Sequence, residues 1–234
     1  MINKKLFAIL PMFCLTLHFS EYSPSDNSTS PLEDGVKITL PEPKYKSDTS
    51  IEKAILNRRS VRSYASQTLT LPEVSQLLWA AQGIIDSSGS RAAPSAGATY
   101  PLEVYIVVGD VEGVAEGIYR YNPHQNELIK VLDGKHRKAL AGAALNQQSI
   151  TEASLNIVIT AIYERTTNRY GERGIRYVHM EAGHAAQNVH LQAVALNLGT
   201  VVVGAFNDDQ VANVMALPDN EVPLYIMPVG RIAD

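Results

Sequence analysis

The sequence predicts one α+β domain organised around a single central sheet. Several runs of β-branched and other apolar residues have the length of buried strands, and helical patterns lie between them. These segments do not follow the regular strand–helix–strand alternation that builds a parallel sheet. With 234 residues, 45% of them hydrophobic, the chain is long enough for one well-buried domain and somewhat short for two.

The first residues are typical of a targeting segment rather than of the domain. In residues 1–20, Lys4 and Lys5 precede an apolar stretch too short to span a bilayer comfortably, which favours a signal peptide or an N-terminal anchor. Pro11 disfavours the alternative, a helix packed on the domain. Residues 21–48 are rich in Ser, Pro and acids, which predicts a linker. We therefore expect an exported or membrane-anchored protein, or a cytoplasmic one if the signal interpretation is wrong.

Two pairs of residues mark the starts of helices. Thr49 and Glu52 have the spacing of a capping box, and the apolar pattern after them runs into a cluster of arginines. Thr70 and Glu73 have the same spacing and predict a helix over 71–82. We expect the folded domain to begin near Thr49.

The most informative segment is Arg58-Arg59-Ser60-Val61-Arg62, at the end of the first helical pattern. If the helix continues through it, Arg58 and Arg62 lie one turn apart on the same face. Three guanidinium groups and a hydroxyl at a helix end suit a dianionic phosphate. A solvated, charged helix face is the alternative for these residues.

The remaining elements of the domain, residues 49–234, follow from apolar runs and turn residues. Continuous apolar runs predict buried strands, two runs separated by a short polar turn predict a hairpin, and small polar residues predict a loop that lines a site. In chain order we expect a loop over 83–99, a strand over 102–108, a hairpin of 117–121 and 127–132, a helix over 135–145, a strand over 156–163, a charged loop over 164–174, a helix over 175–197, a strand over 199–206, a helix over 208–217 and a strand over 222–229.

Composition and spacing argue against several classes of function. The net charge of -4 argues against a nucleic-acid binder. Cys14 is the only cysteine, so we expect neither a disulfide framework nor a cysteine metal site. His179 and His184 lack the spacing of a helical metal site, so we expect no metal. Glu181 belongs to a polar stripe among small residues in the segment 175–197, which favours close helix packing at a subunit interface.

The sequence shows no evident nucleophile or acid–base pair beside the predicted phosphate site, so an enzyme of this kind would rely on a cofactor for its chemistry. Four segments, in order, resemble the nitroreductase-like FMN oxidoreductase family. They are R-R-S-V-R at 58–62, A-P-S-A-G-A-T-Y-P-L-E-V-Y at 93–105, L-N-L-G-T-V-V-V-G-A-F-N at 196–207 and P-V-G-R at 228–231. The resemblance covers about residues 49–231. It implies the nitroreductase-like α+β fold, a central mixed or antiparallel sheet flanked by helices, in an intertwined homodimer.

Two departures from the family pattern indicate a branch. Ala98 stands where the family has Asn, and Tyr100-Pro101-Leu102 stands where it has Gln-Pro-Trp. Together with E-A-G-H-A-A-Q-N at 181–188, this is similar to the SagB-type dehydrogenase branch, whose members oxidise azolines to azoles. The resemblance implies an FMN-dependent enzyme that passes hydride through flavin N5 to or from a small organic substrate.

Two alternatives stay open. One is an NAD(P)H-dependent nitro or quinone reductase, for which NAD(P)H is the electron donor. The other, of a different class, is a non-catalytic exported binding protein for an anionic ligand. The spacing of the residues does not decide between these and a SagB-type dehydrogenase.

The resemblance also implies which residues bind FMN, and it implies no catalytic side chain. The phosphate and ribitol ligands would be Arg58, Arg59, Ser60 and Arg62, with Arg231 at the phosphate end. Residues Pro94, Ser95, Ala96 and Gly97 would reach the flavin from the partner subunit. The isoalloxazine edge would meet Val203, Gly204 and Ala205, and the pyrimidine edge would meet Gln148.

Overall fold

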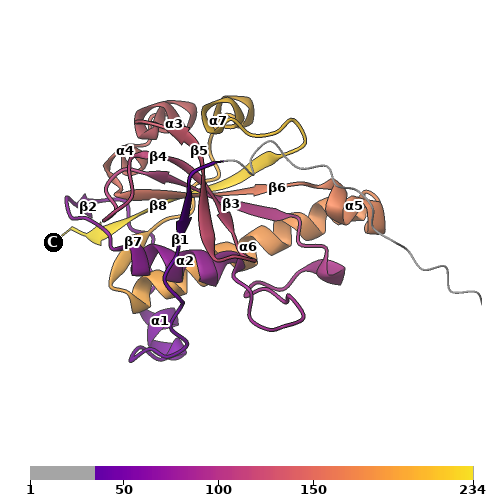
Figure 1. Cartoon of the computed structure of the whole chain (residues 1–234), viewed down its shortest axis with the longest axis horizontal. Helices are drawn as coiled ribbons and strands as arrows, with labels where there is room; N and C mark the ends of the chain where they lie inside the picture. The colour runs from indigo at the N-terminus through magenta and orange to yellow at the C-terminus, as the bar shows by residue number, and fades with distance from the viewer. Residues whose placement is uncertain (1–34, 234) are drawn as a thin grey trace, which may run out of the picture. The chain divides into compact units, whose positions relative to one another are not determined.

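The computed structural model describes residues 35–233, in which one antiparallel sheet runs through the domain (Figure 1). The eight strands are β1 (Lys37–Thr39), β2 (Tyr64–Ala65), β3 (Leu102–Val108), β4 (Gly117–Asn122), β5 (Glu127–Asp133), β6 (Leu155–Ala161), β7 (Leu198–Thr200) and β8 (Val222–Ile232). Seven of them follow the order β1-β5-β4-β3-β6-β8-β2, and β7 pairs with β8 beside this path. The α+β prediction is therefore confirmed, with an antiparallel sheet.

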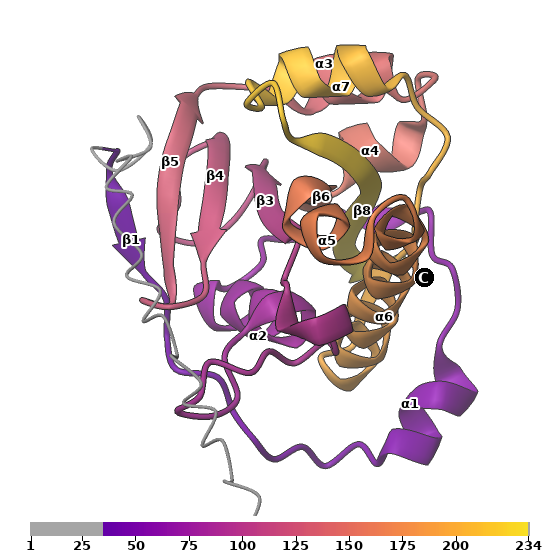
Figure 2. The ribbon, with the colours of Figure 1, turned by 90° about the vertical axis from the view of Figure 1, so that its right-hand side faces the viewer.

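Helices cover both faces of the sheet (Figure 2). They are α1 (Ile51–Asn57), α2 (Leu71–Gln82), the 3-10 helix η1 (Ala96–Ala98), α3 (Arg137–Ala143), α4 (Gln148–Glu152), α5 (Glu164–Tyr170), α6 (Arg173–Ala195) and α7 (Asp208–Met215). In Figure 2, α2 and α6 lie on one face, and α3, α4 and α7 lie on the other. Within residues 35–233, no helix is both long and apolar enough to cross a membrane. The expected signal peptide or anchor, residues 1–20, lies outside the described residues.

The two helical layers explain why the strand over 102–108 is apolar without interruption. Successive side chains of a strand point to opposite faces of a sheet. Val104 and Ile106 pack in the core between the sheet and helices α2 and α6. Tyr105 and Val107 pack in the core between the sheet and helices α3, α4 and α7. Since both faces are covered, both sets of side chains must be apolar.

The helix predicted over 71–82 is confirmed at both ends. The Thr70 N–H donates to the Glu73 carboxylate at 2.9 Å, as the capping box requires. At the other end the Gly83 N–H donates to the Trp79 carbonyl at 2.8 Å. A Cβ at Gly83 would lie 2.2 Å from Trp79 Cδ1, so this turn accepts only glycine without a shift.

The first helix differs from its prediction. Ser50, not Thr49, is the N-cap, and its hydroxyl accepts from the Lys53 N–H at 3.2 Å. The helix ends at Asn57, so Arg58 and Arg62 do not share a helix face. The reason is a competing interaction outside the helix: Ser60 bridges to β7 next to it.

Two further segments differ from expectation. The segment 164–174 contains the helix α5 and the start of α6, where the sequence suggested a loop. Residues 37–48, expected in the linker 21–48, belong to the domain, because β1 pairs with β5 and the Lys44 N–H donates to Gln76. The expected strand 199–206 is regular only as β7, after which Val203 makes an isolated bridge to β8.

Two glycines give a matched test of this packing. We expect Gly83→Ala to lower the free energy of unfolding by roughly 1–3 kcal/mol, because the methyl group overlaps Trp79. We expect Gly142→Ala to raise it by about 0.5–1 kcal/mol, because that position is inside α3 and a Cβ there meets nothing within 4 Å. Urea unfolding measures both, and a neutral Gly83→Ala would contradict the packing at the end of α2.

Candidate functional site

Strand β7 joins two of the segments singled out in the sequence. Ser60 forms a parallel bridge with Thr200, and the Val61 N–H donates to the Thr200 carbonyl at 3.0 Å. Three residues further along the chain, Val203 exchanges backbone hydrogen bonds with Ile226 of β8. The arginine segment 58–62 therefore lies beside the strand that leads directly to 203–205, as a shared site requires.

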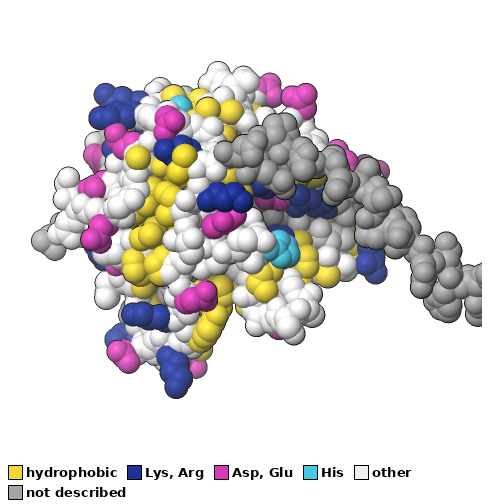
Figure 3. Space-filling view, viewed as in Figure 1, with side chains coloured by type: hydrophobic (Ala, Val, Ile, Leu, Met, Phe, Trp, Pro, Cys, Tyr) yellow, Lys and Arg dark blue, Asp and Glu magenta, His cyan; other side chains and the backbone are white. Residues whose placement is uncertain are grey.

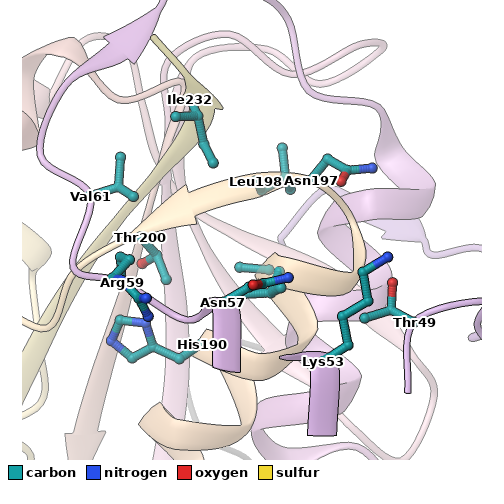
Figure 4. Close-up of a pocket in the computed structure, with 12 residues that line it drawn as sticks. Thr49, Lys53, Asn57, Arg59, Val61, His190, Asn197, Leu198, Thr200 and Ile232 are labelled. Atoms are coloured by element: carbon teal, nitrogen blue, oxygen red, sulfur yellow. The ribbon is translucent and has the colours of Figure 1, made fainter. Parts of the chain in front are cut away.

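A cavity of ≈ 360 Å³ lies between α1, the C-terminal half of α6 and β7 (Figure 4). Of the predicted phosphate ligands, Arg59 lines it, and Figure 4 shows the His190 ring beside the Arg59 side chain. Burial, and then the charge of Arg58, lower the pKa of His190 to about 4, so this imidazole is neutral at pH 7. The buried Thr200 hydroxyl, also in the lining, has no hydrogen-bond partner among the described residues. The cavity thus offers the Thr200 hydroxyl and the Arg59 guanidinium, one nitrogen of which donates to the carbonyls of Leu56 and Arg58, to an anionic or polar ligand.

The segment Val203–Ala205 presents its backbone to the surface. Gly204 and Ala205 are exposed, and within residues 35–233 neither N–H makes a hydrogen bond. A Cβ at Gly204 would have Tyr225 as its nearest neighbour, at 3.6 Å, so the space above the backbone is open. Free N–H groups beside an open surface fit the edge of a flat ring such as isoalloxazine.

The glutamine that reaches this segment is the neighbour of the predicted one. Gln147 donates from Nε2 to the Ala205 carbonyl at 3.0 Å. Gln148 turns away and donates to Glu152, four residues on in α4, at 2.5 Å. Of the two glutamines, only Gln147 is hydrogen-bonded to the segment Val203–Ala205; Gln148, the predicted one, pairs with Glu152.

The loop that carries Pro94–Gly97 is fixed to α5 and α6. Asn188 of α6 donates to the Ala92 carbonyl at 3.3 Å, and Arg169 of α5 donates to the Gly97 carbonyl at 3.0 Å. Inside the loop, the Ser95 hydroxyl accepts from the Tyr100 N–H at 2.9 Å. The loop is thus a firmly held structure rather than a flexible connection.

Glu181 is a buried group that the sequence did not single out for this loop. Its residue exposure is 2%, and one carboxylate oxygen, Oε1, has no hydrogen-bond partner among the described residues. Burial raises the pKa of Glu181 to about 7, opposed by a hydrogen bond from Ser95, the charge of Arg91 and a backbone hydrogen bond from Ala96. The polar stripe containing Glu181 was expected at an interface, whereas this carboxyl faces its own chain's loop.

Helix α6 contacts both halves of the predicted site. Asn188 donates to the Ala92 carbonyl in the loop, and His190, two residues further on, lines the cavity beside Arg59. Glu181, beside Ser95, is nine residues before His190, about 13.5 Å along the helix. Among the described residues, no hydrogen bond joins Pro94–Gly97 to the segment 58–62.

Arg231 has a partner that its predicted role did not include. Its guanidinium binds the Glu73 carboxylate at two points, Nη1–Oε1 at 2.8 Å and Nη2–Oε2 at 2.9 Å. This pair connects the last strand to the first turn of α2. The positive charge of Arg231 is therefore already matched by a carboxylate of its own chain.

The histidines of α6 have separate roles. The His179 ring lies 2.6 Å from the Tyr163 hydroxyl, and His190 faces the cavity described above. Among residues 35–233, no three His, Cys, Asp or Glu side chains are grouped as metal ligands. The face in Figure 3 carries basic, acidic and apolar side chains interspersed.

Comparison with known proteins places this geometry in a family. The chain is 49% identical over 198 residues to a Methanocaldococcus jannaschii protein named for the nitroreductases, covering 85% of this chain and 98% of that protein. It is 25% identical to the FMN reductase (NADPH) of Bacillus subtilis, covering 77% of this chain and 65% of the reductase.

A solved structure shows a similar fold. A chain of the Escherichia coli microcin synthetase complex with a truncated precursor bound superposes with a TM-score of 0.65 at 25% identity, covering 90% of this chain and 85% of that chain. The model of the nitroreductase family matches residues 55–231, nearly the whole described domain. The chain belongs to the nitroreductase family, an oxidoreductase family.

Proposed function

We propose that this protein is an FMN-dependent oxidoreductase. The carrying observation is the exposed backbone of Gly204 and Ala205, with free N–H groups, next to the arginine segment 58–62. The similarity to an FMN reductase supports the same cofactor. When bound, FMN would accept and donate hydride at N5.

The described residues fit the parts of FMN in turn. Arg58, Arg59, Ser60 and Arg62 would hold the phosphate and the ribitol through charge-assisted hydrogen bonds. Gln147 holds the Ala205 carbonyl and so fixes the direction of the Gly204 and Ala205 N–H groups. The N–H and the carbonyl of Val203 both hydrogen-bond to Ile226 of β8, which keeps this edge rigid.

We also propose a homodimer, in which the loop Pro94–Gly97 of a second copy would reach the flavin, as the family resemblance implies. Among the described residues of one chain, no hydrogen bond joins this loop to the segment 58–62. Exposed residues of α6 suit such a contact. The apolar side chains of Ile175 and Met180 are 41% and 53% exposed, and Gly183 of the same helix is exposed as well. Ile55 of α1 is exposed to a similar extent.

For the substrate, we propose an azoline-type or other small organic molecule, as in SagB-type dehydrogenases. The likeness to the microcin synthetase chain and the E-A-G-H-A-A-Q-N segment support this branch. Reduction of a nitro compound or quinone by NAD(P)H is the second candidate, and the FMN reductase (NADPH) relative favours it. Export or anchoring through residues 1–20 stays a proposal that cell fractionation would test.

The flavin proposal has a direct test. We expect purified protein to show a flavin absorption band that NAD(P)H or dithionite bleaches and air restores. We expect Arg58→Ala to lower FMN affinity about tenfold or more, because a charge-assisted hydrogen bond contributes about 1.5–3 kcal/mol. Lys135→Ala, an exposed change on the opposite helical layer, is the control. Equal FMN affinity in both variants, or colourless protein after reconstitution, supports the anion-binding alternative instead.

Substitutions of the two adjacent glutamines test which of them contributes to FMN binding. The structure favours Gln147, and the family resemblance implied Gln148. We expect Gln147→Ala to weaken FMN binding two- to tenfold, because a neutral hydrogen bond contributes about 0.5–1.5 kcal/mol. Gln148→Ala should bind FMN as the unmodified protein does, because its amide pairs only with Glu152. Fluorescence titration of apoprotein with FMN measures both, and the reverse ranking would restore Gln148.

The dimer is tested at Gly183. A Cβ there meets nothing within 4 Å in its own chain, so Gly183→Arg should leave the fold intact while blocking close approach of a second α6. We expect monomers by size-exclusion chromatography with light scattering. Gly142→Arg is equally open but lies on α3, and it should remain dimeric. An unchanged dimer in Gly183→Arg places the interface elsewhere.

A further inference from the structure

A second cluster of arginines lies apart from the segment 58–62. A cleft of ≈ 390 Å³ opens where β3 begins and β4 ends, next to the loop 91–100. Three guanidinium groups line it, those of Arg91, Arg120 and Arg165, together with a single carboxylate, Glu103. We call these four side chains the arginine cleft. Each arginine comes from a different element: the loop, β4 and α5.

The arginine cleft holds more positive than negative charge. Glu103 pairs with Arg165 at 2.7 Å and more loosely with Arg120 at 3.8 Å. Among the described residues, no carboxylate lies within ion-pair distance of Arg91, which donates to the Gln82 side-chain oxygen at 2.9 Å. The nearby Glu181, whose pKa is raised to about 7, is only partly ionised at neutral pH. The buried Glu221 carboxyl also interacts with Glu103 and Arg120, and burial raises its pKa, so the net charge of the cluster depends on the protonation of Glu181 and Glu221.

Two details show that the guanidinium groups of the cleft are not fully satisfied by the described residues. Arg120 Nε is buried and has no hydrogen-bond partner among the described residues, which leaves a charged donor unsatisfied. Burial lowers the pKa of Arg91, the charge of Arg165 lowers it further, and Glu103 opposes both. Converging guanidinium groups with a free donor are suited to phosphate or carboxylate oxygens.

The cleft is connected to the proposed flavin loop through Tyr100. The Tyr100 carbonyl accepts from Arg165 at 3.0 Å, and its N–H donates to the Ser95 hydroxyl at 2.9 Å. Arg91 also stacks over the Tyr100 ring, with its guanidinium carbon 4.7 Å from the centroid. Tyr100 therefore contacts the arginine cleft through Arg91 and Arg165, and it contacts the segment Pro94–Gly97 through Ser95.

We propose that the arginine cleft is an anion-binding subsite for the molecule that reacts at the flavin. It takes a phosphate monoester or a carboxylate on that molecule, at a distance from the reacting atoms. This rests on the proposed flavin function, which brings Pro94–Gly97 to the reaction site. The group belongs either to the 2′-phosphate of NADPH or to an acidic organic substrate.

Direct binding tests the subsite. FMN-loaded protein is titrated calorimetrically with inorganic phosphate, so that FMN already occupies the segment 58–62. We expect Arg120→Gln to weaken phosphate binding about tenfold. Arg165 keeps its contact with Glu103 in this variant, so the fold should be retained, and circular dichroism checks this. Lys135→Gln, an exposed lysine with the same change of charge, should bind phosphate normally.

Kinetics identify the source of the anion. If Arg120→Gln raises KM for NADPH but not for NADH, the subsite binds the donor's phosphate. If it raises KM for 4-nitrobenzoate but not for nitrobenzene, the subsite binds an acidic substrate. An unchanged KM for all four overturns its connection to the reaction. Wild-type protein that binds no phosphate, or Arg120→Gln that binds it as tightly, overturns the subsite itself.

Failure of the flavin function stays distinguishable from failure of the subsite. If the protein does not take up FMN, the phosphate titration is made on Arg58→Ala protein, in which the first cluster is weakened. Phosphate binding that still depends on Arg120 then supports the subsite without a flavin. Binding that is independent of Arg120 excludes it.

Discussion

The length and rigidity of α6 determine how the rest of the site is built. The helix has 23 residues, a span of about 35 Å, and one side of it is buried against the sheet together with α2. Asn188 of α6 holds the loop 91–100 at Ala92, and His190, two residues further on, lines the cavity. A rigid helix therefore fixes the loop and the cavity relative to each other. The proposed dimer would bring a second copy of the loop to this site.

Local signals were sufficient for the elements whose structure is decided locally. The capping box at Thr70 and the glycine at 83 bound α2 correctly, because both act within one turn of the helix. The strand over 102–108 was also predictable, since covering both faces of a sheet requires an unbroken apolar run. The family resemblance added the topology, which no local pattern of this chain contains.

Elements held by distant partners were not predictable in the same way. The segment 58–62 has a helical pattern, but the carbonyl of Thr200, 139 positions after Val61, accepts from the Val61 N–H, and the segment leaves the helix. Strand β1 exists because β5 pairs with it, although its own composition resembles a linker. The same holds for Glu181, whose role depends on a loop that returns from elsewhere in the chain.

Gln147 and Gln148 have different hydrogen-bond partners because of the local backbone conformation before them. Leu145 and Asn146 both have positive φ, 59° and 57°, an unusual backbone for side-chain-bearing residues. This turn makes Gln147 the N-cap of α4 and aims its amide at Ala205, while Gln148 begins the helix and faces Glu152. Which of these two glutamines reaches Ala205 therefore depends on backbone geometry that the composition of the sequence does not reveal.

The arginines of this acidic chain separate by what already neutralises them. Arg231 has a bidentate carboxylate partner and serves to connect β8 to α2. Arg137 satisfies the carbonyls of Thr151 and Ala153 and packs against Gly109, so it is structural as well. In the segment 58–62, by contrast, Arg59 and Arg62 are exposed, so solvent stabilises their charge and no ligand is needed for the fold itself. In the arginine cleft, the Arg120 Nε is buried with no hydrogen-bond partner among the described residues. Since an unsatisfied buried donor is costly, a bound anion that supplies an acceptor there would stabilise the protein.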